Sequence, residues 1–197
     1  MVIDDERRKV IFVHIPKTGG HTISDMFGGF HQNRDKKHSR HALSNIYKTL
    51  YPEEWSTYYK FTFVRNPWEK LISSLSPKGL LLTDERFQVH RKDIRSSIEK
   101  LYKDRSLLNR THILFQTYWL LDENGIPCHF DFIGRNESFF VDLNRLLTIL
   151  GLPIKNEIKI TFASAHRHYT EYYDDDMINM VGEIYKKDID YLGYTYE

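Results

Sequence analysis

The chain has 197 residues, 41% of them hydrophobic, which is enough for a sizeable buried core, and we expect a single domain over residues 1–197. Its 28 lysines and arginines nearly cancel 27 aspartates and glutamates, so neither nucleic acid nor an anionic membrane surface is expected as a partner. The single cysteine, Cys128, cannot form an intrachain disulfide, which favours a reducing, cytoplasmic location. No stretch approaches the ~20 apolar residues of a membrane span, which predicts a soluble protein unless a membrane anchor has been removed.

Two segments of the first half begin as strands and continue as helices. The run KVIFVHI at 9–15 is β-branched and aromatic, as in a strand buried on both faces, and Pro16 and a Gly-Gly pair separate it from a helix expected over 21–27. The aromatic run YKFTFV at 59–64 predicts a second strand, which leads into a helix over 68–75. The order strand, tight loop, helix is typical of a phosphate-binding site.

The rest of the chain continues this alternation. A short helix over 42–50 should end at Pro52. Residues 83–103 are highly charged with weak periodicity, which predicts an exposed helical or mobile segment of unknown role. The other expected elements are helices over 112–121, 139–150 and 175–191 and a strand over 130–134. Strands that alternate with helices predict a three-layer α/β sandwich around a mainly parallel sheet.

The loop after the first strand has the residue types that bind anions. Backbone N–H groups at a helix N-terminus attract anionic oxygens, glycines allow close approach, and a lysine can neutralise charge that grows on a leaving group. The candidate residues of this loop are Lys17, Thr18, Gly19, Gly20 and Thr22. On these residues alone, a simple turn between a strand and a helix accounts for the pattern equally well.

The order of residues in this loop argues against ATP chemistry. The nucleotide-kinase loop has the pattern G-x-x-x-x-G-K-[ST], whereas here the lysine precedes the glycines. A kinase-like phosphotransferase is therefore disfavoured and stays an alternative. A second alternative is a non-catalytic member of the fold that keeps the nucleotide site and has lost its base.

Two motifs of the first half are HIPKTGG at 14–20 and FVRNPWEKLISS at 63–74. Together they resemble the sulfotransferases that use 3'-phosphoadenylyl sulfate (PAPS), in particular their carbohydrate branch. The similarity continues through DFIGRNE at 131–137 and YKKDIDYLGYTY at 185–196. The resemblance implies an enzyme with a fold like that of the P-loop nucleotide hydrolases. It also implies sulfuryl transfer from PAPS, which leaves 3'-phosphoadenosine 5'-phosphate (PAP), to a hydroxyl or amine of a small-molecule or carbohydrate acceptor.

The same resemblance assigns roles to individual residues. It implies that the loop at Lys17 binds the 5'-phosphosulfate, and that Arg65 and Ser73 bind the 3'-phosphate. His21 stands where the family usually has threonine, and Thr22 stands at its usual serine. The alternative is that Arg65 pairs with a carboxylate and Ser73 is an ordinary residue of a helix surface.

Sulfuryl transfer also needs a base that removes the proton of the acceptor, and a histidine near neutral pKa suits that task. His38 and His41 lie between the two motifs, in the interval where the resembling enzymes have their base. His41 aligns slightly better than His38. No cysteine or carboxylate pair nearby completes a tetrahedral set with these two histidines, so no metal is expected.

Overall fold

A computed structural model describes residues 1–5, 8–28, 38–75, 91–154 and 167–196. Contacts group the chain into two compact units. The first unit comprises Met1–Val64 and Tyr118–Phe162, and the second comprises Arg65–Thr117 and Ala163–Glu197. The expectation that residues 1–197 form a single domain stays a prediction.

A four-stranded sheet forms the centre of the first unit. In spatial order its strands are β1 (Val2–Asp4), β2 (Lys9–Phe12), β3 (Tyr59–Val64) and β4 (Phe132–Arg135). Strands β2, β3 and β4 run parallel, with Phe12 beside Phe61 and Phe61 beside Phe132, while β1 is antiparallel to β2. The mainly parallel sheet is therefore confirmed. Its antiparallel edge strand was not predicted from the charged N-terminal sequence.

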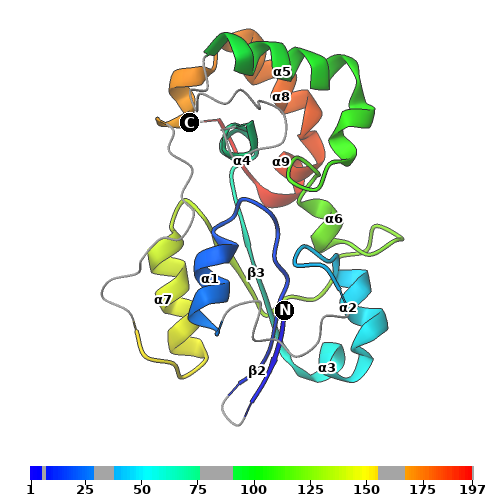
Figure 1. Cartoon of the computed structure of the whole chain (residues 1–197), viewed down its shortest axis with the longest axis vertical. Coiled ribbons are helices and arrows are strands. Elements are labelled where there is room, and N and C mark those ends of the chain that lie inside the picture. Colours follow the sequence, from blue (N-terminus) through cyan, green and yellow to red (C-terminus); the bar gives the residue numbers. More distant parts are fainter. Residues whose placement is uncertain (6–7, 29–37, 76–90, 155–166, 197) are drawn as a thin grey trace. The chain divides into compact units, whose positions relative to one another are not determined.

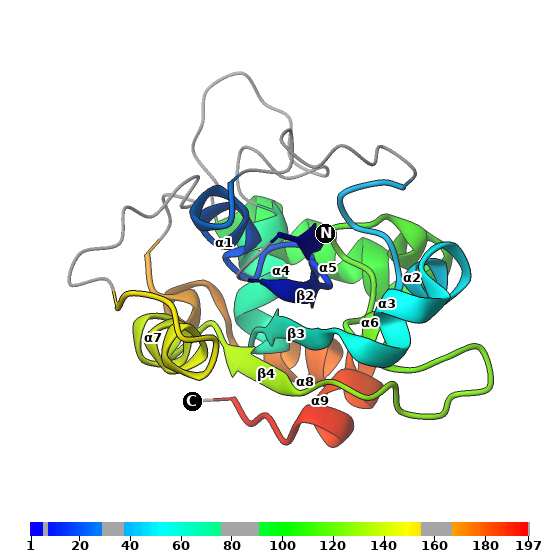
Figure 2. The same cartoon turned by 90° about the horizontal axis from the view of Figure 1, so that it is seen from below.

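Helices cover both faces of this sheet. They are α1 (Gly20–Met26), α2 (Ser44–Leu50), α3 (Pro52–Thr57) and α7 (Phe139–Ile149). Helices α1 and α7 lie on one side of the strands, and α2 and α3 lie on the other (Figures 1 and 2). On the side of α1 and α7, alternate strand residues such as Phe12 and Phe61 pack against Ile23 and Leu143, so the period of two along each strand produces one core face.

The second unit is helical in its described residues. Its elements are α4 (Pro67–Leu75), α5 (Arg91–Lys103), the 3₁₀ helices η1 (Arg105–Asn109) and η2 (Tyr169–Tyr172), α8 (Asp175–Ile184) and α9 (Lys186–Leu192). A short helix, α6 (Thr117–Leu120), begins at the last residue of this unit's first segment. Among the described residues, no helix has the length and apolar character needed to cross a membrane.

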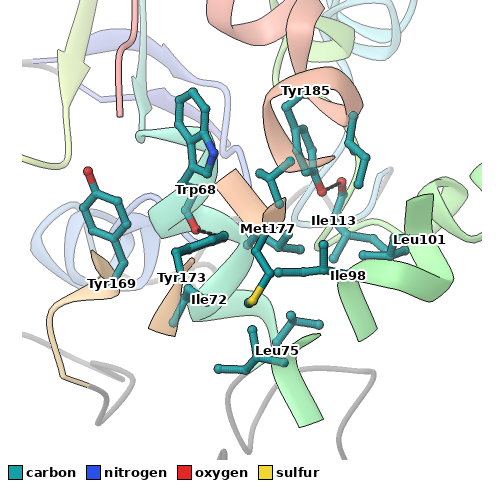
Figure 3. Close-up of a cluster of buried hydrophobic side chains, with 14 of the residues drawn as sticks. Trp68, Ile72, Leu75, Ile98, Leu101, Ile113, Tyr169, Tyr173, Met177 and Tyr185 are labelled. Carbon is teal, nitrogen blue, oxygen red and sulfur yellow. Dashed lines mark hydrogen bonds between the residues drawn. The ribbon is translucent and has the colours of Figure 1, made fainter. Parts of the chain in front are cut away.

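The core of the second unit combines aliphatic and tyrosine side chains (Figure 3). Tyr173 donates its hydroxyl hydrogen to the backbone oxygen of Trp68 over 2.9 Å, and Tyr185 donates to that of Ile113 over 2.7 Å. Each buried hydroxyl therefore has a partner, which offsets the cost of removing it from water. These bonds tie the residues that follow η2 and α8 to segments that are distant in sequence.

The helix expected over 42–50 is confirmed within two residues as α2, which ends before Pro52. Pro52 itself begins α3, because a proline at the first helical position lacks only an N–H that the helix leaves unpaired anyway. Residues 91–103 do form a helix, but Ile94, Ile98 and Leu101 are fully buried, so this part of the charged segment is not simply exposed. Residues 83–90 of that prediction lie outside the described residues.

Two further helices are shorter than predicted. Residues 111–114 form turns and bends, and only Thr117–Leu120 of the helix expected over 112–121 is helical. The helix expected over 175–191 is divided into α8 and α9 at the buried Tyr185. The helices expected over 21–27, 68–75 and 139–150 are each confirmed within one residue or two.

Candidate active site

The loop between β2 and α1 has an unusual backbone. Lys17 has φ 67° and Gly19 has φ 84°, and Lys17 is the one non-glycine residue with positive φ in the described part of the chain. A left-handed conformation costs a residue with a side chain about 1–2 kcal/mol. The hydroxyl of the fully buried Thr18 donates to the backbone oxygen of Ile15 over 2.9 Å and closes the turn. Strain of this kind gathers at functional sites, which favours a role for the conformation of Lys17.

The two glycines of the loop are required by close packing. A Cβ atom on Gly20 would lie 2.0 Å from Nε2 of His14, and one on Gly19 would lie 2.5 Å from Cε2 of Phe139. His14, two residues after β2, and Phe139, the first residue of α7, therefore pack directly on the loop backbone. The glycine pair has a structural reason that is independent of any ligand, and it does not by itself indicate a phosphate site.

His14 is the buried centre of a group of imidazole rings. Only 2% of its surface is exposed, and its ring stacks on Phe12 at a centroid distance of 5.4 Å. The ring of His41 lies 4.4 Å away and that of His21 5.8 Å away. Burial first, and then the nearby His41 and His21, hold the pKa of His14 well below its usual value. His14 is therefore neutral at physiological pH and serves to pack the loop.

His41 is attached to the loop through the backbone of His14. Its Nδ1 lies 3.1 Å from the backbone oxygen of His14, and because a carbonyl oxygen can only accept, Nδ1 carries a hydrogen. In neutral His41 the lone pair is therefore on Nε2, the atom that a general base would use. The backbone oxygen of His41 accepts from Nε1 of Trp119 over 3.1 Å, which fixes the residue from its other side.

His38, the other candidate base, has different surroundings. Its Nδ1 lies 2.8 Å from the backbone oxygen of Ser39, and its ring packs on Tyr47 at 4.6 Å and Tyr51 at 5.7 Å. These tyrosines belong to α2 and its C-terminal end. The described contacts of His38 thus join it to an aromatic cluster, whereas those of His41 join it to the candidate loop.

Arg40 is a residue of this site that sequence reasoning missed. Its Nη1 lies 3.0 Å from Nδ1 and 3.2 Å from Nε2 of His21. A guanidinium can only donate, so the ring nitrogen that receives its hydrogen is unprotonated and His21 is neutral. Burial first, and then the charge of Arg40, lower the pKa of His21 accordingly. The position of Arg40 directly before His41 was the signal available in the sequence.

Arg65, in the second unit, pairs with a carboxylate. Its Nη2 donates to Oε1 of Glu69 over 2.8 Å across the first turn of α4, and their side chains are 12% and 21% exposed. The alternative that the sequence left open, pairing of Arg65 with a carboxylate, is therefore present. A guanidinium has five N–H donors, so one contact with Glu69 is compatible with a second anionic partner.

Ser73 lies inside α4 with 1% of its surface exposed. The alternative that Ser73 is an ordinary residue of the helix surface is therefore wrong. Candidate residues 17–22, together with His38 and His41, belong to the first unit, and Arg65 and Ser73 belong to the second. Among the described residues, no group of three or more histidine, cysteine, aspartate or glutamate side chains is arranged to hold a metal ion.

The chain matches the model of a known protein family. The model of the sulfotransferase family matches residues 1–195 of the chain, which covers both units and both candidate motifs. No curated protein and no solved structure matches it.

Proposed function

Because the chain belongs to the sulfotransferase family, we propose that it transfers a sulfuryl group from PAPS to a hydroxyl or amine of an acceptor, with carbohydrates as the favoured acceptor class. The observation that carries this proposal is the loop between β2 and α1, where Lys17 adopts a strained conformation and His41 is bonded to the backbone at His14. The fold that we expect is the P-loop-like variety of the α/β class.

The loop is proposed to bind the 5'-phosphosulfate. The carboxyl ends of parallel strands are where open α/β sheets bind ligands, and the loop follows β2 at such an end. Backbone N–H groups of Gly19, Gly20, His21 and Thr22 would face the anionic oxygens, and Lys17 would neutralise the bridging oxygen as the S–O bond breaks. The hydroxyl of Thr18 already donates to the backbone oxygen of Ile15 within the turn. We therefore propose that Thr18 contacts the phosphosulfate through its backbone N–H and not through its side chain.

The 3'-phosphate is proposed to bind Arg65 and Ser73. A guanidinium binds a phosphate through two parallel hydrogen bonds, which a lysine cannot reproduce. Ser73 is almost fully buried, so its hydroxyl would contribute only to a phosphate that reaches into α4. We therefore assign the larger part of the 3'-phosphate affinity to Arg65.

His41 is proposed as the general base. Its Nε2 would take the proton of the acceptor hydroxyl while the acceptor oxygen bonds to sulfur and the bond between sulfur and the phosphate oxygen breaks. PAP then leaves with the electron pair of that bond, and the proton stays on His41. Nδ1 keeps its hydrogen bond to the backbone oxygen of His14, which holds the ring in one orientation.

The test is a transfer assay with PAPS labelled at sulfur and a panel of oligosaccharides. We expect a sulfated product, and a loss of about 100-fold or more in turnover for His41→Ala. His129→Ala is the matched control, because the side chain of His129 is 73% exposed and lies 3.0 Å from Asp131, and it should keep full activity. Loss of activity in His38→Ala but not in His41→Ala would reassign the base. Phosphoryl transfer from ATP in place of sulfuryl transfer would contradict the proposal.

A further inference from the structure

Asp188 is a buried carboxylate to which the mechanism above gives no role. It lies on α9, none of its surface is exposed, and its oxygens accept three hydrogen bonds. The donors are the backbone N–H of Gln116 at 2.7 Å, and the backbone N–H and hydroxyl of Thr117, each at 2.9 Å. Burial raises the pKa of Asp188, and these hydrogen bonds oppose the rise. A carboxylate this deep in the protein needs such partners, and here they fix one short segment of backbone.

The same segment is held through its carbonyl groups. The buried Lys70 donates from Nζ to the backbone oxygens of His112 at 3.1 Å and Leu114 at 2.9 Å. The hydroxyl of Tyr185 donates to the backbone oxygen of Ile113, which lies between these two residues. Five backbone groups of residues 112–117 therefore bond to side chains of α4, α9 and the residue between α8 and α9, which offsets the absence of a regular helix over 112–116.

Gln116 connects this segment to Arg65 through hydrogen bonds. Its side chain is fully buried, its Oε1 accepts from the backbone N–H of Arg65 at 2.9 Å, and its Nε2 donates to the backbone oxygen of Arg65 at 2.7 Å. One amide thus pairs with both backbone groups of the arginine, as a neighbouring strand would. The side chain of Arg65 is oriented separately by Glu69.

We propose that Gln116, held by Asp188, is a positioning residue for Arg65, and that this frame sets the preference of the protein for nucleotides with a 3'-phosphate. The inference rests on the proposed function, in which Arg65 binds that phosphate. Bidentate recognition needs the guanidinium to be placed to within about 0.5 Å, and a displaced backbone at Arg65 would move it further than that. Gln116 and Asp188 act on the phosphate only through Arg65.

The experiment compares calorimetric binding of PAP with that of AMP, which lacks the 3'-phosphate. Gln116→Glu keeps an acceptor for the N–H of Arg65 and loses the donor to its backbone oxygen, so PAP affinity should fall about tenfold while AMP affinity stays within about twofold. Asn179→Asp, on the exposed side of α8, adds the same charge in the same unit and should change neither affinity. If Gln116→Glu does not fold, Gln116→Met is used instead, because methionine is neutral and similar in length to glutamine. It should show the same selective loss of PAP affinity.

A second background separates positioning from general support of the fold. In Arg65→Ala, where the proposed phosphate contact is gone, Gln116→Glu should cause no further loss of PAP affinity. Equal weakening of PAP and AMP, or an undiminished effect in the Arg65→Ala background, would overturn the inference and leave the proposed function intact. A wild-type protein that binds PAP no better than AMP would overturn the 3'-phosphate assignment itself, and the inference with it.

Discussion

At the loop after β2, individual side chains decide the backbone. His14 and Phe139 lie so close to Gly20 and Gly19 that no other residue fits without displacement, and Lys17 is held in a left-handed conformation beside them. The loop is therefore shaped before any ligand arrives. A site whose atoms are already in place loses less entropy on binding, which is the property expected of an anion-binding loop in an enzyme.

Gly19→Ala tests this packing. Gly19 and Gly151 both have positive φ, but an added Cβ atom would meet the ring of Phe139 at Gly19 and nothing within 4 Å at Gly151. We expect Gly151→Ala to lower the free energy of unfolding by about 1 kcal/mol, from backbone strain alone. Gly19→Ala should lower it by about 2–4 kcal/mol, because overpacking adds to the strain. Denaturation in urea measures both.

The pairing of Gly19 with Phe139 also predicts non-additivity. Phe139→Leu removes the ring atoms that would meet the new methyl group, so the double variant should be more stable than the sum of the single changes by about 1 kcal/mol. Two results would show that the ring of Phe139 moves aside without an energetic cost. One is an equal loss of unfolding free energy in Gly19→Ala and Gly151→Ala, and the other is additive effects of Gly19→Ala and Phe139→Leu.

Sequence reasoning identified the residues of the loop because their order along the chain carries the signal. Lys17, Gly19 and Gly20 lie within four consecutive positions, and Arg65 directly follows the strand predicted over 59–64. Glu69, the carboxylate that pairs with Arg65, lies only four positions further along the chain. Asp188 and Gln116 are separated by 72 positions. Nothing in the sequence near either residue predicts that the carboxylate of Asp188 accepts from the backbone N–H of Gln116. Such contacts arise only when the core of the second unit has formed.

Helix α4 begins with a side-chain cap that Asn66 supplies, in the sequence Arg-Asn-Pro at 65–67. Oδ1 of Asn66 accepts from the backbone N–H of Trp68 at 3.0 Å, and Pro67 occupies the first helical position, where its missing N–H costs nothing. Nδ2 of Asn66 donates to the backbone oxygen of Thr195 at 2.9 Å and so ties the C-terminal segment to the same point.

Substitutions of Asn66 should separate these two contributions. Asn66→Ala removes the cap and the bond to Thr195, and we expect it to lower the free energy of unfolding by about 2 kcal/mol. Asn66→Asp keeps an acceptor for the helix N-terminus and loses only the donor, so its cost should be about half as large. Thermal or urea unfolding gives the comparison. Equal costs for the two variants would mean that Oδ1 contributes nothing as a cap.

The elements that the sequence predicted well are those in which one pattern dominates. The aromatic and β-branched run at 59–64 coincides with β3, and the apolar spacing of 139–150 gives α7. In α5 a single stripe of Ile94, Ile98 and Leu101 is surrounded by charges that obscure its period. Residues 112–116 have helix-compatible spacing, but Lys70, Tyr185 and Asp188 bind their backbone groups instead, and tertiary contacts override local propensity.

The candidate residues that the sequence singled out are distributed over both units. The family match runs through both, from residue 1 to residue 195, and each unit has candidate residues from one of the two motifs that the sequence singled out. The mainly parallel sheet could be predicted because strands alternate with helices along the chain. The division into two units could not, because no composition shift or linker marks the boundary at Arg65.

The most direct test of the central claim, a nucleotide site for PAPS, is calorimetric titration of the purified protein with PAP. We predict one PAP per chain, bound about tenfold or more weakly in Lys17→Ala and in Arg65→Ala, since each substitution would remove a proposed charged contact to phosphate. Magnesium ATP should bind more weakly than PAP. The claim would be contradicted by the absence of PAP binding, by tighter binding of magnesium ATP, or by PAP affinity that neither substitution changes.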